Sequence, residues 1–105
     1  MNSRLFGIAL LTISAAGLTS AQAADVSVLI KNFDYSPMKL NISAGTTVVW
    51  KNLDGEPHTI ASVDGMFRSP ALDQNDSYSF TFNKPGVFKY ICSIHPKMKA
   101  TITVR

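Results

Sequence analysis

Residues 77–92 read Ser77-Tyr-Ser-Phe-Thr-Phe-Asn-Lys-Pro-Gly-Val-Phe-Lys-Tyr-Ile-Cys92, and this stretch decides the fold. Its aromatic side chains recur at every second position, at Tyr78, Phe80, Phe82, Phe88 and Tyr90. A period of two is typical of a strand with one buried face. The dipeptide Pro85-Gly86 is a turn signal between the two runs. The segment therefore predicts two strands joined by a turn, with Cys92 at the end of the second strand and on its buried face.

The same alternation recurs on both sides of this segment. Apolar residues occupy alternate positions that would share one strand face, at Val26, Val28 and Ile30, at Val48 and Trp50, and at Ala100, Ile102 and Val104. Turn signals separate these runs, at Ser36-Pro37, Ala44-Gly45, Asp54-Gly55, Asp64-Gly65 and Asn75-Asp76. Several short strands at this spacing, with almost no helical periodicity, predict an all-β protein with an antiparallel β-sandwich or barrel. Residues 61–72 fit neither period, and we expect a long connection between the sheets there.

The first 23 residues differ in character from the rest of the chain. Arg4 lies in a short positive start, residues 5–18 are largely apolar, and Ala21-Gln22-Ala23 has the small-x-small pattern of a cleavage site. These features are typical of a secretory signal peptide. A membrane anchor is the alternative, but it needs about 20 apolar residues. We expect residues 1–23 to be cleaved, leaving 24–105 as a single domain in the periplasm without membrane insertion.

Charge and cysteine content exclude some classes of function. The formal net charge is +3, or +2 without Arg4, and no basic run is interleaved with aromatics. We therefore expect no nucleic-acid partner. The chain has one cysteine, so it cannot form the internal disulfides common in small exported domains. A single thiol in such a chain indicates an intermolecular disulfide, a reactive group or a metal ligand.

The segment Cys92-Ser93-Ile94-His95-Pro96-Lys97-Met98 spaces a thiol, an imidazole and a thioether three residues apart. Taken singly, each has an ordinary alternative as a buried thiol, a surface histidine or a core methionine. Taken together, at the end of a strand and on a loop that Pro96 restricts, they can converge on one point. His58 is the only other histidine and the candidate for a fourth ligand, its alternative being an exposed loop residue.

Two imidazoles, one thiolate and one thioether suit copper in both of its oxidation states. Zinc gains little from a thioether, calcium and magnesium prefer oxygen donors, and iron–sulfur clusters need more thiolates. We expect one copper ion bound by His58, Cys92, His95 and Met98. Four protein ligands leave no open position for a substrate, and both histidines are then used, so we do not expect an enzyme.

The chain resembles the cupredoxins, or type 1 blue copper proteins, and within them the amicyanin subfamily. The resemblance is carried by Tyr35-Ser36-Pro37, 45–52, Pro57-His58, 80–82, Pro85-Gly86 and the Cys-x-x-His-x-x-Met spacing of 90–98. It implies a Greek-key β-sandwich in which His58, Cys92 and His95 form a trigonal plane and Met98 makes a long axial contact. Thr59 stands where the family commonly has an asparagine that ties the two ligand loops together.

This resemblance also implies a function. It predicts an electron carrier that cycles between Cu(II) and Cu(I), with redox proteins as partners, and we expect the protein to be a monomer. An amine dehydrogenase would be the donor and a c-type cytochrome the acceptor. The alternatives are a copper protein for storage, delivery or resistance, and a metal-free sandwich for adhesion or assembly. The latter would leave the ligand spacing unexplained.

His95 lies on an outward loop, and we expect its imidazole edge to be the port for the electron. An apolar patch is expected around it, formed by Pro57, Met66, Ile94 and Pro96. Lys97 and Lys99 would attract an acidic partner to this patch. The alternative for these residues is an ordinary scatter of surface side chains.

Overall fold

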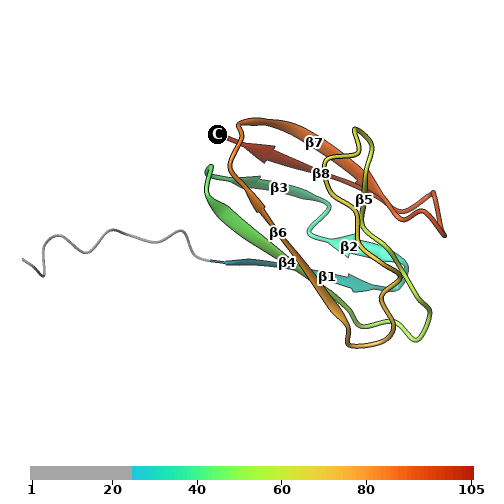
Figure 1. The fold of residues 1–105 in the computed structure, drawn as a ribbon. Coiled ribbons are helices and arrows are strands. Elements are labelled where there is room, and N and C mark those ends of the chain that lie inside the picture. The colour runs from blue at the N-terminus through green and yellow to red at the C-terminus, as the bar shows by residue number, and fades with distance from the viewer. Residues whose placement is uncertain (1–24) are drawn as a thin grey trace, which may run out of the picture.

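Eight strands in two four-stranded sheets form the regular structure of residues 25–105, the part of the chain that the computed structural model describes. The strands are β1 (Val26–Lys31), β2 (Asp34–Ser36), β3 (Lys39–Ile42), β4 (Thr46–Asn52), β5 (Ala61–Ser62), β6 (Ser77–Phe82), β7 (Gly86–Ile91) and β8 (Lys99–Val104). The sheets have the orders β2-β1-β4-β6 and β3-β8-β7-β5 (Figure 1). The expected all-β sandwich is thus confirmed. The signal peptide expected at 1–23 lies outside the described residues, and within these no helix is long and apolar enough to span a membrane.

Each sheet contains one parallel pair, so the sheets are mixed and not purely antiparallel. β1 runs parallel to β4, and β3 runs parallel to β8, while the other pairs are antiparallel. The cause is the path of the chain, which changes sheet at every connection from β2 to β7. β4 therefore returns beside β1 by way of the opposite sheet, whereas a tight hairpin would have made the pair antiparallel. These crossovers are of the Greek-key kind that the resemblance implies.

The core lies between the sheets and is rich in aromatic rings. Trp50 of β4 is fully buried, and its indole N–H donates a hydrogen bond to the hydroxyl of Tyr90 on β7 over 3.1 Å. Burial raises the pKa of Tyr90 to about 12, against the smaller lowering effect of this bond, so its hydroxyl is neutral at physiological pH. Phe67 packs beside Trp50 with ring centroids 6.0 Å apart.

The expected long connection at 61–72 contains only the two-residue strand β5. It nevertheless contributes to the core, because Phe67 and Leu72 are each 3% exposed. Leu72 also forms an isolated β-bridge with His58, with hydrogen bonds of 3.1 and 2.8 Å between their backbones. The connection thus fixes the backbone of a candidate ligand as well as filling the sandwich.

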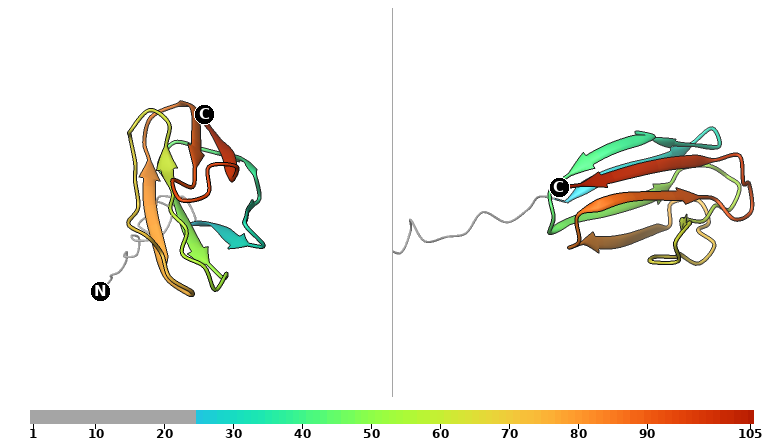
Figure 2. Two further views of the ribbon diagram at one scale, coloured as in Figure 1. Left: turned by 90° about the vertical axis from the view of Figure 1, so that its right-hand side faces the viewer. Right: turned by 90° about the horizontal axis from the view of Figure 1, so that it is seen from above.

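Three loops gather at one end of the sandwich. They follow β1, β4 and β7, and they lie at the end away from the C-terminus (Figure 2, right). The strands beneath them pair with their neighbours up to Ile30↔Asn52 and Ile91↔Lys99, so the loops start from fixed positions. All residues expected to bind a metal lie on or next to these loops.

Candidate metal centre

The loop of Cys92–Met98 is closed by hydrogen bonds across its base. Cys92 directly follows β7 and Met98 directly precedes β8, beside the strand pair Ile91↔Lys99. The Cys92 N–H donates to the carbonyl of Met98 over 3.1 Å, and the Met98 N–H donates to the carbonyl of His95 over 2.9 Å. The loop therefore extends the hairpin of two paired strands and holds its side chains in a fixed arrangement.

Three of the predicted ligands converge on one point. Nδ1 of His58 lies 3.9 Å from Sγ of Cys92, and Nδ1 of His95 lies 3.8 Å from the same sulfur. The ligand atoms of all three residues lie within 4.8 Å of one another. A metal about 2.0 Å from each nitrogen and about 2.3 Å from the sulfur would separate nitrogen from sulfur by roughly 3.7 Å in a trigonal plane. The donors thus fit a single ion with a soft, mixed ligand set.

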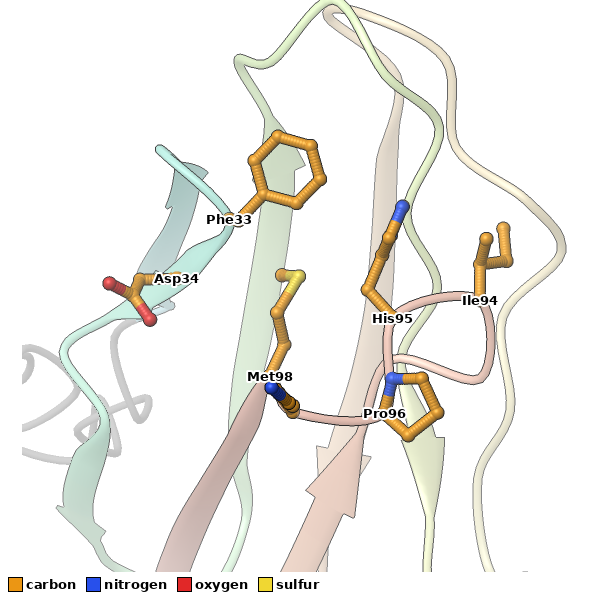
Figure 3. A pocket seen from close by; sticks show the side chains of 7 residues that line it. Phe33, Asp34, Ile94, His95, Pro96 and Met98 are labelled. Carbon is orange, nitrogen blue, oxygen red and sulfur yellow. The ribbon is translucent and has the colours of Figure 1, made fainter.

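Met98 lies beside these three residues. Its side chain is 3% exposed, and in Figure 3 the thioether points towards the space between Phe33 and His95. This placement suits a fourth, weaker donor. Its role as the axial ligand stays a prediction.

The sulfur of Cys92 is fully buried, and its surroundings favour the thiolate. Burial alone would raise the pKa of Cys92, but hydrogen bonds outweigh it and lower that pKa to about 6. They come from the backbone N–H of Thr59, 3.3 Å from the sulfur, and from the imidazole and backbone of His95. Since the thiolate is the form that binds metals, the free protein already presents the competent ligand near neutral pH.

Thr59 ties the two ligand loops together. Its hydroxyl oxygen accepts a hydrogen bond from the Ser93 N–H over 2.8 Å and shares another with the Ser93 hydroxyl over 2.9 Å. The same oxygen lies 3.8 Å from the sulfur of Cys92. Threonine therefore makes the connection between the loops that an asparagine commonly makes in the proteins that the chain resembles.

Asp54 is a residue of this site that the sequence analysis identified only as part of a turn. Its Oδ2 lies 2.8 Å from Nε2 of His58, and its carboxylate also accepts the N–H groups of Asn32 and Phe33 over 2.8 and 2.9 Å. Partial burial would raise the pKa of Asp54, but these backbone amides and the imidazole of His58 outweigh it and lower the pKa. An aspartate four residues before a candidate ligand was the only sequence signal for this role.

Phe33 was also missed, because it belongs to a corner and not to an alternating strand. Asn32 and Phe33 have φ values of 55° and 62°, a left-handed conformation that turns the chain sharply between β1 and β2. The ring of Phe33 meets both His58 and His95 edge-on, with centroids 4.9 Å away in each case. Phe33 is 44% exposed, so it forms part of the surface beside the two imidazoles.

An open pocket of about 510 Å³ adjoins His95 (Figure 3). It is lined by Phe33, Asp34, Ile94, His95, Pro96, Lys97 and Met98. Two residues of the expected apolar patch, Ile94 and Pro96, therefore border His95. Met66 instead packs partly buried against the core, and Pro57 is exposed but does not line the pocket. In their place, Phe33 is the further apolar residue that lines the pocket beside His95.

Comparisons with known proteins agree with this geometry. A family model described as "Cupredoxin-like domain" matches residues 3–104. Amicyanin-alpha of Methylorubrum extorquens is 34% identical over 80% of this chain and 75% of its own. A purple cupredoxin from Nitrosopumilus maritimus has a similar structure, with a TM-score of 0.70 and 37% identity over 76% of this chain and 99% of its own. A copper-containing nitrite reductase from Thermus scotoductus also matches, with a TM-score of 0.72 and 35% identity, over 76% of this chain but only 22% of its own.

Proposed function

Because the chain belongs to the family of cupredoxin-like domains, we propose that it is a blue copper protein that carries one electron at a time between redox proteins. One copper ion is bound by His58, Cys92 and His95, with Met98 as the axial ligand. The observation that carries the proposal is the convergence of one sulfur and two imidazole nitrogens within 4.8 Å of one another. No other donor set among residues 25–105 brings together three such side chains.

Bound copper supplies a one-electron couple at this site. The residues of the chain hold the donors nearly still, because the Cys92 loop is fixed to two paired strands and Thr59 ties it to the loop of His58. Ligands that are held in place before the metal binds need little rearrangement when its charge changes. Four protein donors would fill the coordination sphere and leave no position for a substrate, so we propose a carrier and not an enzyme.

We propose that electrons enter and leave at His95. This residue is half-buried, with its imidazole at the pocket that Phe33, Ile94 and Pro96 line. An apolar rim around a ligand edge lets a partner approach closely while water is displaced. Lys97 and Lys99 are exposed next to this rim and favour an acidic partner surface.

The cellular setting belongs to the same proposal. The start of the chain, with Arg4, the apolar run at 5–18 and Ala21-Gln22-Ala23, supports export to the periplasm and cleavage after residue 23. The resemblance to amicyanins supports an amine dehydrogenase as electron donor and a c-type cytochrome as acceptor. We propose a monomer that docks with each in turn.

The test is optical and electrochemical. The copper-loaded, oxidised protein should show an intense visible band from thiolate-to-copper charge transfer, and Cys92→Ser should abolish that band. Cyclic voltammetry should show a reversible one-electron wave. An irreversible wave, together with ready loss of copper to a chelator, would instead identify a storage or delivery protein. A folded protein that takes up no copper would refute both functions.

A further inference from the structure

The carboxylate of Asp54 joins two parts of the molecule that are distant in sequence. Its Oδ1 accepts the N–H of Asn32, and its Oδ2 accepts both the N–H of Phe33 and Nε2 of His58. A carboxylate can only accept hydrogen bonds, so Nε2 of His58 must carry the hydrogen. The lone pair of the neutral ring is then on Nδ1, the atom 3.9 Å from the sulfur of Cys92.

From this arrangement we propose that Asp54 is a positioning residue for the metal site. It fixes the tautomer and the ring plane of His58, and its negative charge makes that imidazole a stronger donor to the oxidised metal. The inference rests on the proposed function, because it assigns a role within the same copper site. It goes further because Asp54 itself would not contact the metal, and yet its removal should change the reduction potential measurably.

Burial around His58 gives Asp54 this influence. The imidazole is fully buried, while the carboxylate of Asp54 is 12% exposed, so little water competes for the bond between them. Carboxylate partners of metal-bound imidazoles orient the ring and raise its basicity, and their loss typically costs about 10–100-fold in metal affinity or activity. A more basic imidazole favours the higher charge state of the metal. Asp54 should therefore hold the reduction potential down.

The same carboxylate also fixes the position of Phe33, the aromatic residue that lines the pocket beside His95. Successive N–H groups on a tight turn can form a concave site for an anion, and here the N–H groups of Asn32 and Phe33 bind the carboxylate of Asp54. This contact holds the corner that places the ring of Phe33 edge-on to His58 and His95. Removing the carboxylate should thus disturb both the imidazole of His58 and the position of the Phe33 ring.

Three variants of the full mature protein separate charge from position. Asp54→Asn keeps the size of the side chain and an oxygen that can accept from His58, but it removes the charge. Asp54→Ala removes both the charge and the oxygen that accepts from His58. Asp34→Asn is the matched control, since Asp34 lines the pocket beside His95. Its carboxylate is turned away from Phe33 and His95 in Figure 3. Circular dichroism would first verify that each variant is folded.

Voltammetry of the copper-loaded proteins is the main measurement. Asp54→Asn should lower the ratio of Cu(II) to Cu(I) affinity about tenfold, which raises the potential by about 59 mV for a one-electron couple. Asp54→Ala should raise it at least as much and also change the shape of the visible band. Asp34→Asn should produce a much smaller shift. Equal shifts from Asp34→Asn and Asp54→Asn would overturn the proposal, because the effect would then be one of general charge.

A second measurement does not depend on copper. Nitrogen NMR of the metal-free protein should show His58 as the Nε2–H tautomer, and Asp54→Ala should produce a mixture of tautomers. An unchanged tautomer in Asp54→Ala would refute the positioning role even in a protein that carries electrons. Conversely, the expected change of tautomer in a protein that binds no copper would leave this hydrogen bond established while the proposed function failed.

Discussion

The backbone N–H of Thr59 donates a hydrogen bond to the sulfur of Cys92 over 3.3 Å, although 33 residues separate them in sequence. This bond joins the loop after β4 to the loop after β7. Because it is made by the main chain, substitution of the Thr59 side chain leaves it in place. The hydroxyl contacts of Thr59 can therefore be tested separately from the bond to sulfur.

Thr59→Val should destabilise the metal-free protein by about 1–2 kcal/mol, because the Ser93 N–H and hydroxyl lose the oxygen that they contact. Thermal unfolding measures the change. Thr59→Ser keeps the oxygen and is the control, so it should restore most of the lost stability. If both variants unfold alike, the tie between the loops contributes nothing through its hydroxyl.

The metal-free protein should become less stable as the pH falls towards about 6. The pKa of Cys92 is lowered to about 6 in the folded chain from an ordinary value of 9.0, so folding favours the thiolate. The contribution of the Cys92 thiolate to the free energy of unfolding is present in full above pH 9 and is lost as the pH falls through 6. The free energy of unfolding should therefore be smaller at pH 6 than at pH 9.

Urea unfolding of the metal-free protein at several pH values between 5 and 9 checks this dependence. Cys92→Ser is the control, since it has no thiol to titrate and should show a flatter profile over the same range. A wild-type profile as flat as that of Cys92→Ser would mean that the thiol titrates normally in the folded chain.

Tyr90→Phe should cost about 1–3 kcal/mol, because the indole N–H of the fully buried Trp50 loses its acceptor. For a domain of this size each kcal/mol lowers the melting temperature by about 4–8 °C. Tyr78→Phe removes the same hydroxyl from a half-buried ring of β6 and should have a smaller effect. The visible band of the copper-loaded protein should stay unchanged in both variants.

Pro96→Glu should slow electron exchange between oxidised and reduced molecules about tenfold, equivalent to 1.4 kcal/mol of docking energy, while the visible band is preserved. The introduced charge would lie at the rim of the pocket beside His95. Pro85→Glu places the same charge on the exposed turn before β7, at the opposite end of the sandwich, and serves as the control. NMR line broadening in mixed samples gives the rates. Equal rates in the two variants would argue against His95 as the port.

The sequence predicted those parts of the fold that depend on local periodicity. Val48 and Trp50 are buried on one face of β4, and Phe88 and Tyr90 on one face of β7, as the alternation indicates. It did not predict the parallel pairing of β1 with β4, because pairing across the sandwich depends on the route of the chain and not on the pattern within a strand.

The candidate site shows the same division. The grouping of His58, Cys92 and His95 was predictable, because few residue types bind soft metals and the loop spaces its donors regularly. The roles of Asp54 and Phe33 were not. They depend on a left-handed corner that meets a loop about 20 residues further along the chain, and aspartate and phenylalanine are too common to indicate such a contact by themselves.

The hairpin register beneath the metal loop makes the loop an exchangeable unit. The pair Ile91↔Lys99 closes the sheet directly below it, and β8 is held on its other side by β3. A segment of different length could therefore be grafted between these two positions while the sandwich keeps its pairing. Evolution, or protein engineering, could in this way change the properties of the metal site by replacing the seven residues of this loop while the rest of the sandwich stays the same.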